Sequence, residues 1–197
     1  MRLQNVIAAG AAAIFLVGCS DKNSSDPLTR DGLPPMRWDH RVEADVWTRT
    51  TLSAIEANGN ALTDLVPADI DAYCPAYKTA STQDRAAFWS GLISALAKHE
   101  STWNPTAAGG GGRWIGLTQI APGTARGYGC KAKSAAALKN GADNLSCAVR
   151  IMSSTVPRDG VVSAGGRGVA ADWGPFHSSK KLADMKNWTQ QQSYCVQ

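Results

Sequence analysis

The sequence predicts one mainly α-helical domain. Four stretches repeat apolar residues at three- and four-residue intervals, the spacing of one helix face, and no stretch alternates like a half-buried strand. The 197 residues are 44% hydrophobic and 18% charged, which suits a single domain and excludes collagen-like, coiled-coil, disordered and polytopic membrane proteins. Glycine-rich connections at 109–112 and 165–168 separate the later helices.

The four helices are expected in the following order. The first covers residues 39–58 and ends at an Asn-Gly pair, a common helix stop. The second begins at Ser81, because residues 81–84 resemble a capping box with aspartate in place of glutamate. The third and fourth are expected over 143–153 and 179–192, where the apolar spacing returns.

The first 35 residues are expected to precede the domain. Residues 6–17 form an apolar run that is too short for a spanning helix of roughly 20 residues but typical of a secretion signal. A polar, proline-containing segment follows. We therefore expect a signal peptide over 1–18, a tether over 19–35 and the domain over 36–197.

The end of the apolar run, Leu16-Val17-Gly18-Cys19, resembles the lipobox of bacterial lipoproteins. That resemblance implies cleavage before Cys19 and acylation of its thiol. Ser20, in place of aspartate, resembles the signal for sorting to the outer membrane. The domain is thus expected in the periplasm on a lipid anchor, and a secreted or soluble periplasmic protein is the alternative.

Four cysteines remain once Cys19 is assigned to lipid. An even number in an exported chain favours two disulfides, for which three pairings exist. We prefer Cys130–Cys147 as a local link and Cys74–Cys195 as a bond that ties the C-terminus back. No CxxC spacing is present, so neither a zinc site nor a thioredoxin-like site is expected.

Charge and motifs exclude further classes. The net charge of +4 is compatible with an anionic polymer but too small to indicate nucleic acid. The sequence lacks HExxH, GxSxG and GxxxxGK motifs, so metalloprotease, serine hydrolase and nucleotide chemistry have no support. No cofactor and no metal are expected.

One of only three glutamates extends the apolar stripe of the second helix. At about 100° per residue, Trp89, Ile93, Leu96 and Glu100 share a face. Burial and the negative end of the helix dipole both disfavour an ionised carboxylate, so we expect the pKa of Glu100 to rise from about 4.3 towards about 6. A general acid for glycosidic cleavage needs such a pKa. A glutamate that merely ends the helix is the alternative.

Three segments around Glu100 resemble one family. His-Glu-Ser-Thr-Trp-Asn-Pro at 99–105, Gly-Leu-Thr-Gln-Ile at 116–120 and Pro-Gly-Thr-Ala at 122–125 are similar in order and spacing to soluble lytic transglycosylases, relatives of goose-type lysozyme. The resemblance implies a lysozyme-like, mainly α fold. It also implies cleavage of the β-1,4 bond between MurNAc and GlcNAc in peptidoglycan.

The resemblance also implies roles for single residues. Glu100 matches the catalytic acid/base of the family, and Ser101 and Gln119 match positions that line the sugar groove. Thr118 stands where the family usually has methionine, so one apolar sugar contact is lost or replaced.

A downstream Ala-Tyr-Asn motif of the family has its best counterpart at Ala171-Asp172-Trp173. Asp172 and Trp173 are therefore expected on the groove wall. Trp103 and Trp173 are next to motifs and are candidates to stack on sugar rings, with Trp114 as a third and core packing as the alternative.

The lytic reaction implied by the resemblance needs one carboxyl group. Glu100 protonates the glycosidic oxygen, and its carboxylate then accepts the proton of the C6 hydroxyl, which closes a 1,6-anhydro ring. Hydrolysis as in goose-type lysozyme would use a second carboxylate, for which Asp172 is the first candidate and a loop or cap role the alternative. We expect transglycosylation; an inactive peptidoglycan-binding scaffold is the remaining hypothesis.

Overall fold

The computed structural model describes residues 32–58 and 60–196, so the expected signal peptide, Cys19 and most of the tether lie outside the described residues. The helices and strands are α1 (Ala44–Ala57), α2 (Thr82–Ser101), β1 (Ala108–Gly109), β2 (Trp114–Ile115), α3 (Pro122–Gly127), α4 (Ala135–Leu138), α5 (Gly141–Asp159) and α6 (Ser179–Thr189). Six short 3-10 helices lie between and after them: η1 (Ile70–Ala72), η2 (Pro75–Lys78), η3 (Ala164–Gly166), η4 (Gly168–Ala171), η5 (Gly174–His177) and η6 (Ser193–Cys195). The mainly α class is confirmed.

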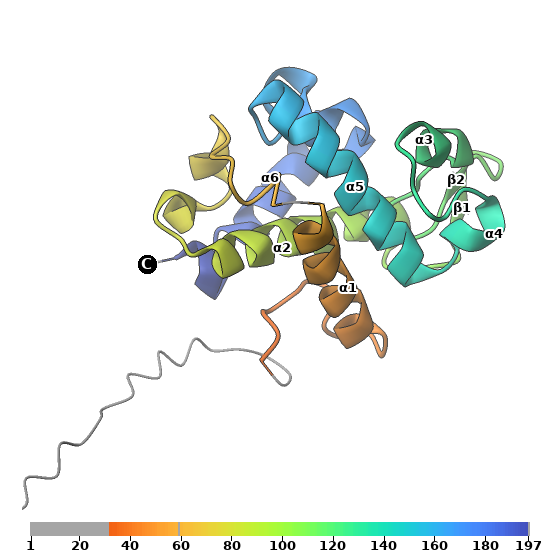
Figure 1. Cartoon of the computed structure of the whole chain (residues 1–197), viewed down its shortest axis with the longest axis horizontal. Helices are drawn as coiled ribbons and strands as arrows, with labels where there is room; N and C mark the ends of the chain where they lie inside the picture. Colours follow the sequence, from red (N-terminus) through yellow and green to blue (C-terminus); the bar gives the residue numbers. More distant parts are fainter. Residues whose placement is uncertain (1–31, 59, 197) are drawn as a thin grey trace, which may run out of the picture.

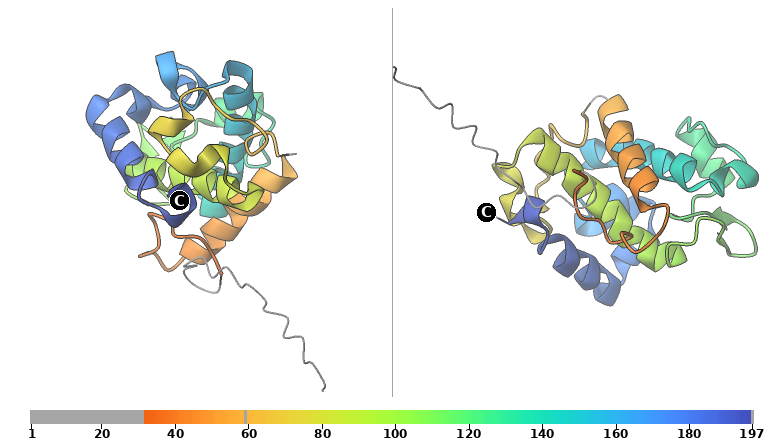
Figure 2. Two further views of the ribbon diagram at one scale, coloured as in Figure 1. Left: turned by 90° about the vertical axis from the view of Figure 1, so that its left-hand side faces the viewer. Right: turned by 90° about the horizontal axis from the view of Figure 1, so that it is seen from below.

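Helix α2 lies at the centre of the domain. All its residues from Ala87 to Ala97 are buried, and α1 packs on one side of it while α6 packs on the other (Figure 2). Helix α5 packs along α1 and ends beside η4 (Figure 1). Trp38, Trp47 and Trp89 are buried in this core, as tryptophans of a helical domain commonly are.

The predicted helix starts are confirmed in one case and wrong in another. Helix α2 begins as expected, because the Ser81 hydroxyl oxygen accepts the Asp84 amide at 3.1 Å and its proton goes to the Asp84 carboxylate at 2.6 Å. The first helix starts five residues later than predicted. Val42, which the apolar spacing of residues 39–58 would place on the buried face, is 97% exposed, so the spacing there does not reflect burial.

The folded part begins before residue 36. Leu33 and Met36 are buried, and the Tyr194 hydroxyl donates a hydrogen bond to the Pro35 carbonyl at 3.2 Å. The last residues of the expected tether thus pack on the domain.

Residues 102–140 form a small lobe at the N-terminal end of α5 (Figure 1). Its hairpin pairs Ala108 with Ile115 and Gly109 with Trp114. Gly110, Gly111 and Gly112 all have positive φ and make the turn, a conformation that glycine adopts without a steric penalty. Strands of two residues are too short to show an alternating pattern, which is why the sequence did not predict this hairpin.

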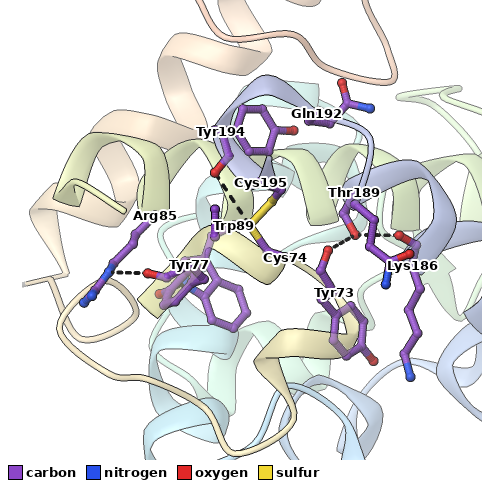
Figure 3. The surroundings of a disulfide bond; sticks show 12 residues. Tyr73, Cys74, Tyr77, Arg85, Trp89, Lys186, Thr189, Gln192, Tyr194 and Cys195 are labelled. Atoms are coloured by element: carbon purple, nitrogen blue, oxygen red, sulfur yellow. Dashed lines mark hydrogen bonds between the residues drawn. A yellow bond between two sulfur atoms is a disulfide. The ribbon is translucent and has the colours of Figure 1, made fainter. Parts of the chain in front are cut away.

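Both preferred disulfides are present. Cys130–Cys147 joins the small lobe to α5, and Cys74–Cys195 joins the residue before η2 to the last turn of the chain (Figure 3). Among the described helices, none has the length and apolar content needed to cross a membrane.

Candidate active site

Glu100 is the last residue but one of α2. Trp89, Ile93 and Leu96 on the same face are fully buried, and Glu100 itself is partly buried. The other faces of α2 are also buried from Ala87 to Ala97, so burial surrounds the helix and is not confined to the predicted stripe. Burial raises the pKa of Glu100 to about 7, although the positive charge of Lys181 on α6 acts in the opposite direction. No described residue donates a hydrogen bond to this carboxyl group. Near neutral pH, Glu100 is therefore a proton donor with no internal partner.

Ser101 and Gln119 hold the segment that follows the hairpin against α2. The Ser101 hydroxyl donates to the Leu117 carbonyl at 2.8 Å, which fastens this segment next to Glu100. Gln119 has φ near +51° and folds its side chain inward, where its amide donates to the Gly116 carbonyl at 2.9 Å. Both side chains use their hydrogen-bonding groups within the protein, and contact with a sugar stays a prediction for each.

Asn144 on α5 is an important residue that the sequence analysis missed. Its carbonyl oxygen accepts the amide and the hydroxyl of Thr118 at 2.9 and 2.7 Å. Its amide nitrogen donates to the carbonyls of Ile115 and Leu138 at 2.9 and 3.1 Å. The side chain is fully buried. Three of its hydrogen bonds join α5 to residues 115–118 beside Glu100, and the fourth goes to Leu138 on α4.

We expect Asn144→Ala to destabilise the domain by about 3 kcal/mol or more, because it removes four buried hydrogen bonds. The Thr118 amide and hydroxyl and the Leu138 carbonyl lose this partner, whereas the Ile115 carbonyl keeps the Ile120 amide. Asn144→Asp preserves the shape but places carboxylate oxygens against two carbonyls, and should also destabilise. Urea denaturation measures both, with Asn140→Ala, which removes only the α5 cap, as a milder control. Equal losses of unfolding free energy in Asn140→Ala and Asn144→Ala would contradict the conclusion that the buried hydrogen bonds of Asn144 contribute more to stability than the α5 cap.

The expected sugar contacts of Thr118 and Trp173 are not compatible with the structure. Thr118 is fully buried with its hydroxyl on Asn144, and Trp173 is 3% exposed. The indole nitrogen of Trp173 donates to the Thr118 carbonyl at 2.8 Å. The side chains of Thr118 and Trp173 thus hold the segment beside Glu100 from the protein interior. The hydrogen bond from the Thr118 hydroxyl to Asn144 is the physical reason why threonine suits position 118.

Asp172 is the C-cap residue of η4, which agrees with the simpler of its two expected roles. Solvent reaches it, yet nearby protein atoms raise the pKa of its carboxyl group by desolvation. Its carboxylate accepts a hydrogen bond from the Tyr128 hydroxyl at 3.3 Å. No hydrogen bond between described residues joins Asp172 to Glu100.

The tryptophans near the motifs differ in exposure. The Trp103 indole donates to the Ser94 carbonyl at 2.9 Å and its ring packs edge-on against His40, which supports the alternative role in packing. Trp103 is only partly buried, and its contact with a sugar stays a prediction. Trp114 is 44% exposed and lies beside the glycine turn, with the Arg113 guanidinium 4.7 Å from its ring centroid. Trp114 is thus the tryptophan near the motifs that keeps a large open face.

Asp184 on α6 collects three basic side chains around the end of α2. It accepts both Arg37 amines at 2.6 and 2.9 Å, Lys98 at 3.3 Å and His99 at 2.7 Å. The Arg37 guanidinium holds the pKa of Asp184 well below its usual range. His99 is therefore a structural neighbour of Glu100, and this cluster positions α6 and Lys181 relative to Glu100.

Metal ligands do not cluster in the described part of the chain. No group of three or more His, Cys, Asp or Glu residues there is arranged to hold a metal ion. Acid–base chemistry at Glu100 needs none.

This architecture is that of a lysozyme-like helical domain with one partly buried glutamate at the end of its central helix. Residues 79–163 match the family model described as Transglycosylase SLT domain. This segment is therefore similar to the SLT domain, which confirms the resemblance to soluble lytic transglycosylases for residues 79–163. The match includes Glu100, Gln119 and Asn144 but ends before Asp172 and Trp173.

Solved structures of DslA share the fold. A glutamate-to-glutamine mutant of DslA has a TM-score of 0.75 and 28% identity, covering 83% of this chain and 98% of that one. Wild-type DslA gives a TM-score of 0.74 with the same identity and coverage. A mutant at another glutamate gives 0.73 and 28%, covering 82% and 97%. A comparison with curated proteins gave no significant match. Together with the SLT domain, the likeness supports a function of the lytic transglycosylase type, on peptidoglycan glycan strands.

Proposed function

We propose that this protein is a murein lytic transglycosylase in which Glu100 is the single catalytic acid/base. The observation that carries the proposal is the raised pKa of about 7 of a partly buried carboxyl group, placed within the matched SLT segment. A carboxyl group with that pKa is protonated in a useful fraction of molecules at neutral pH, as a general acid must be.

The proposed reaction proceeds in two proton transfers. Glu100 donates its proton to the oxygen of the β-1,4 bond as the bond to C1 of MurNAc breaks. The resulting carboxylate accepts the proton of the C6 hydroxyl, whose oxygen closes on C1 to give 1,6-anhydroMurNAc. Glu100 ends protonated, and no water is consumed. Lys181 lies close enough to favour the carboxylate of the intermediate stage.

Hydrolysis is the second candidate function, and the environment of Asp172, the candidate second carboxylate, is the observation in its favour. Its pKa is raised, and the Tyr128 hydroxyl orients it. Against it, Asp172 lies outside the SLT match and caps η4. The similar DslA structures include mutants at two different glutamates. This chain has two glutamates besides Glu100, namely Glu43 and Glu56, and they lie at the two ends of α1.

The products distinguish the candidates. We expect mass spectrometry of the sugars released from purified sacculi to show ends in 1,6-anhydroMurNAc, about 18 Da lighter than the hydrolysed form because no water is added. Ends in reducing MurNAc that disappear in Asp172→Asn would establish hydrolysis instead. Saturable sacculus binding without any released sugar would establish the scaffold hypothesis.

We also propose that the protein is attached to the outer membrane through Cys19. The support is the lipobox resemblance at 16–19 together with two disulfides, which form in an oxidising compartment. Cells expressing the full chain should incorporate labelled fatty acid into it, and Cys19→Ser should abolish the label. A labelled Cys19→Ser protein, or native protein whose other four cysteines react with a thiol reagent, would contradict this.

A further inference from the structure

Two adjoining hollows lie along α1 and α5, away from the residues assigned to catalysis. They measure about 490 and 410 Å³ and share Ala54, Ala57 and Ser146, so they form one groove. Neither Glu100, Ser101 nor Gln119 lines it. Four basic residues line this groove, and no acidic one does: Arg49, Lys131, Lys133 and Arg150. We call it the basic groove.

The charge of the groove follows from an uneven distribution along the chain. Between Glu100 and Asp143 the sequence contains five basic residues and no acidic residue. Glu56 and Asp143 lie on the helices that form the groove but do not line it. Among the described residues, no acid forms an ion pair with a groove cation. Their positive charge is thus available to a ligand.

The positions of the basic side chains in the groove are fixed by a buried neighbour, a disulfide and a hydrogen bond. Ala132 is buried between exposed Lys131 and Lys133, so both lysines project to the same side, roughly 7 Å apart as in an extended segment. The neighbouring Cys130 is bonded to Cys147 on α5. The Arg150 Nε donates to the Tyr128 carbonyl at 2.6 Å, which fixes the guanidinium while leaving its terminal amines for a ligand.

We propose that the basic groove is a second peptidoglycan-binding site, which recognises carboxylates of the peptides attached to the glycan strands. The inference rests on the proposed function, because that function defines the polymer. Regularly spaced carboxylates complement a groove lined by cations alone, and exposed charge pairs of this kind add affinity that salt weakens. The site holds insoluble wall material while Glu100 acts on the sugar backbone.

The test compares two double variants of the full chain with identical changes in net charge. Lys131→Glu/Lys133→Glu alters the groove, and Lys78→Glu/Arg167→Glu alters exposed residues elsewhere. Binding is measured with Cys19→Ser and Glu100→Gln also present, so that neither lipid nor cleavage interferes. At low salt, the dissociation constant for intact sacculi should rise about five- to tenfold for the groove variant only, and the difference should disappear at high salt.

Assays with other substrates distinguish failure of the groove proposal from failure of the proposed function. With Glu100 restored, the groove variant should cleave soluble, peptide-free glycan at the wild-type rate. Absence of cleavage by every form would refute the proposed function and leave the binding result intact. Three results would refute the groove proposal: unchanged sacculus binding, an equal loss in the control variant, or an equal loss on sacculi freed of peptides by an amidase. Charge-dependent binding only to vesicles of anionic phospholipid would assign the groove to a membrane instead.

Discussion

Replacing Glu100 by glutamine is expected to slow the cleavage of peptidoglycan by roughly 10³-fold or more. Glutamine has nearly the shape of glutamate but no transferable proton, so both proton transfers lose their catalyst. The release of anhydro-muropeptides from sacculi measures the loss. Binding to sacculi should remain, because the segment beside Glu100 is held by Ser101, Asn144 and Thr118 rather than by Glu100.

Glu56→Gln is the matched control, because Glu56 is exposed on α1 and does not contact these residues. It should cleave like the wild type. Activity of Glu100→Gln within tenfold of the wild type would mean that another group supplies the proton, and Asp172→Asn would then be the next variant to measure.

The raised pKa of Glu100 has two consequences: both the activity and the stability of the fold should fall as pH rises. The acid form donates the proton, so kcat/KM should fall as pH rises through about 7. The folded state retains this proton between about 4.5 and 7 whereas the unfolded chain loses it, so ionisation destabilises the fold as pH rises through that window. At pH 8, Glu100→Gln should therefore melt a few degrees above the wild type, reflecting about 1–2 kcal/mol after allowance for partial exposure. At pH 4 the two should melt together.

Removing the Cys74–Cys195 disulfide is expected to have the largest effect on stability. The bond links positions 121 residues apart, and loop entropy assigns such a constraint about 4–5 kcal/mol. It also retains the chain end that follows α6, and Thr189, the last residue of α6, donates to the Tyr73 carbonyl at 2.8 Å (Figure 3). Cys74→Ser/Cys195→Ser should lower the melting temperature by roughly 10 °C.

The second disulfide provides the control. Cys130–Cys147 spans only 17 residues, so Cys130→Ser/Cys147→Ser should cost about 3 kcal/mol and a smaller change in melting temperature. Both variants should retain cleavage of soluble glycan below their melting temperatures. The reverse order of stability would show that strain or residual structure in the unfolded chain outweighs loop length.

Several features of this protein follow from short stretches of sequence. The start of α2 depends on residues 81–84 alone, and the position of Glu100 depends on helix periodicity from Trp89. The motifs at 99–125 predict the similarity to the SLT domain because they preserve order and spacing. Such features require only neighbours along the chain, so one sequence was enough to predict them.

Other features depend on segments that meet only in the folded molecule. Thr118 and Trp173 were expected on a sugar-facing surface, but hydrogen bonds across 26 and 55 positions turn them inward. Asn144 and Asp184 were not singled out, because each acts through partners on distant elements: Asp184 meets Arg37 across 147 positions.

The sequence alone therefore determined the helical class, the position of Glu100 near the end of a buried helix and the even set of cysteines that form two disulfides. These properties depend on side-chain type and on periodicity within one helix. Only the tertiary structure decided which side chains face the site, which support it from behind, and where the unpaired positive charges gather. Burial and hydrogen-bond partners are properties of the packed chain, so a pattern along it does not contain them.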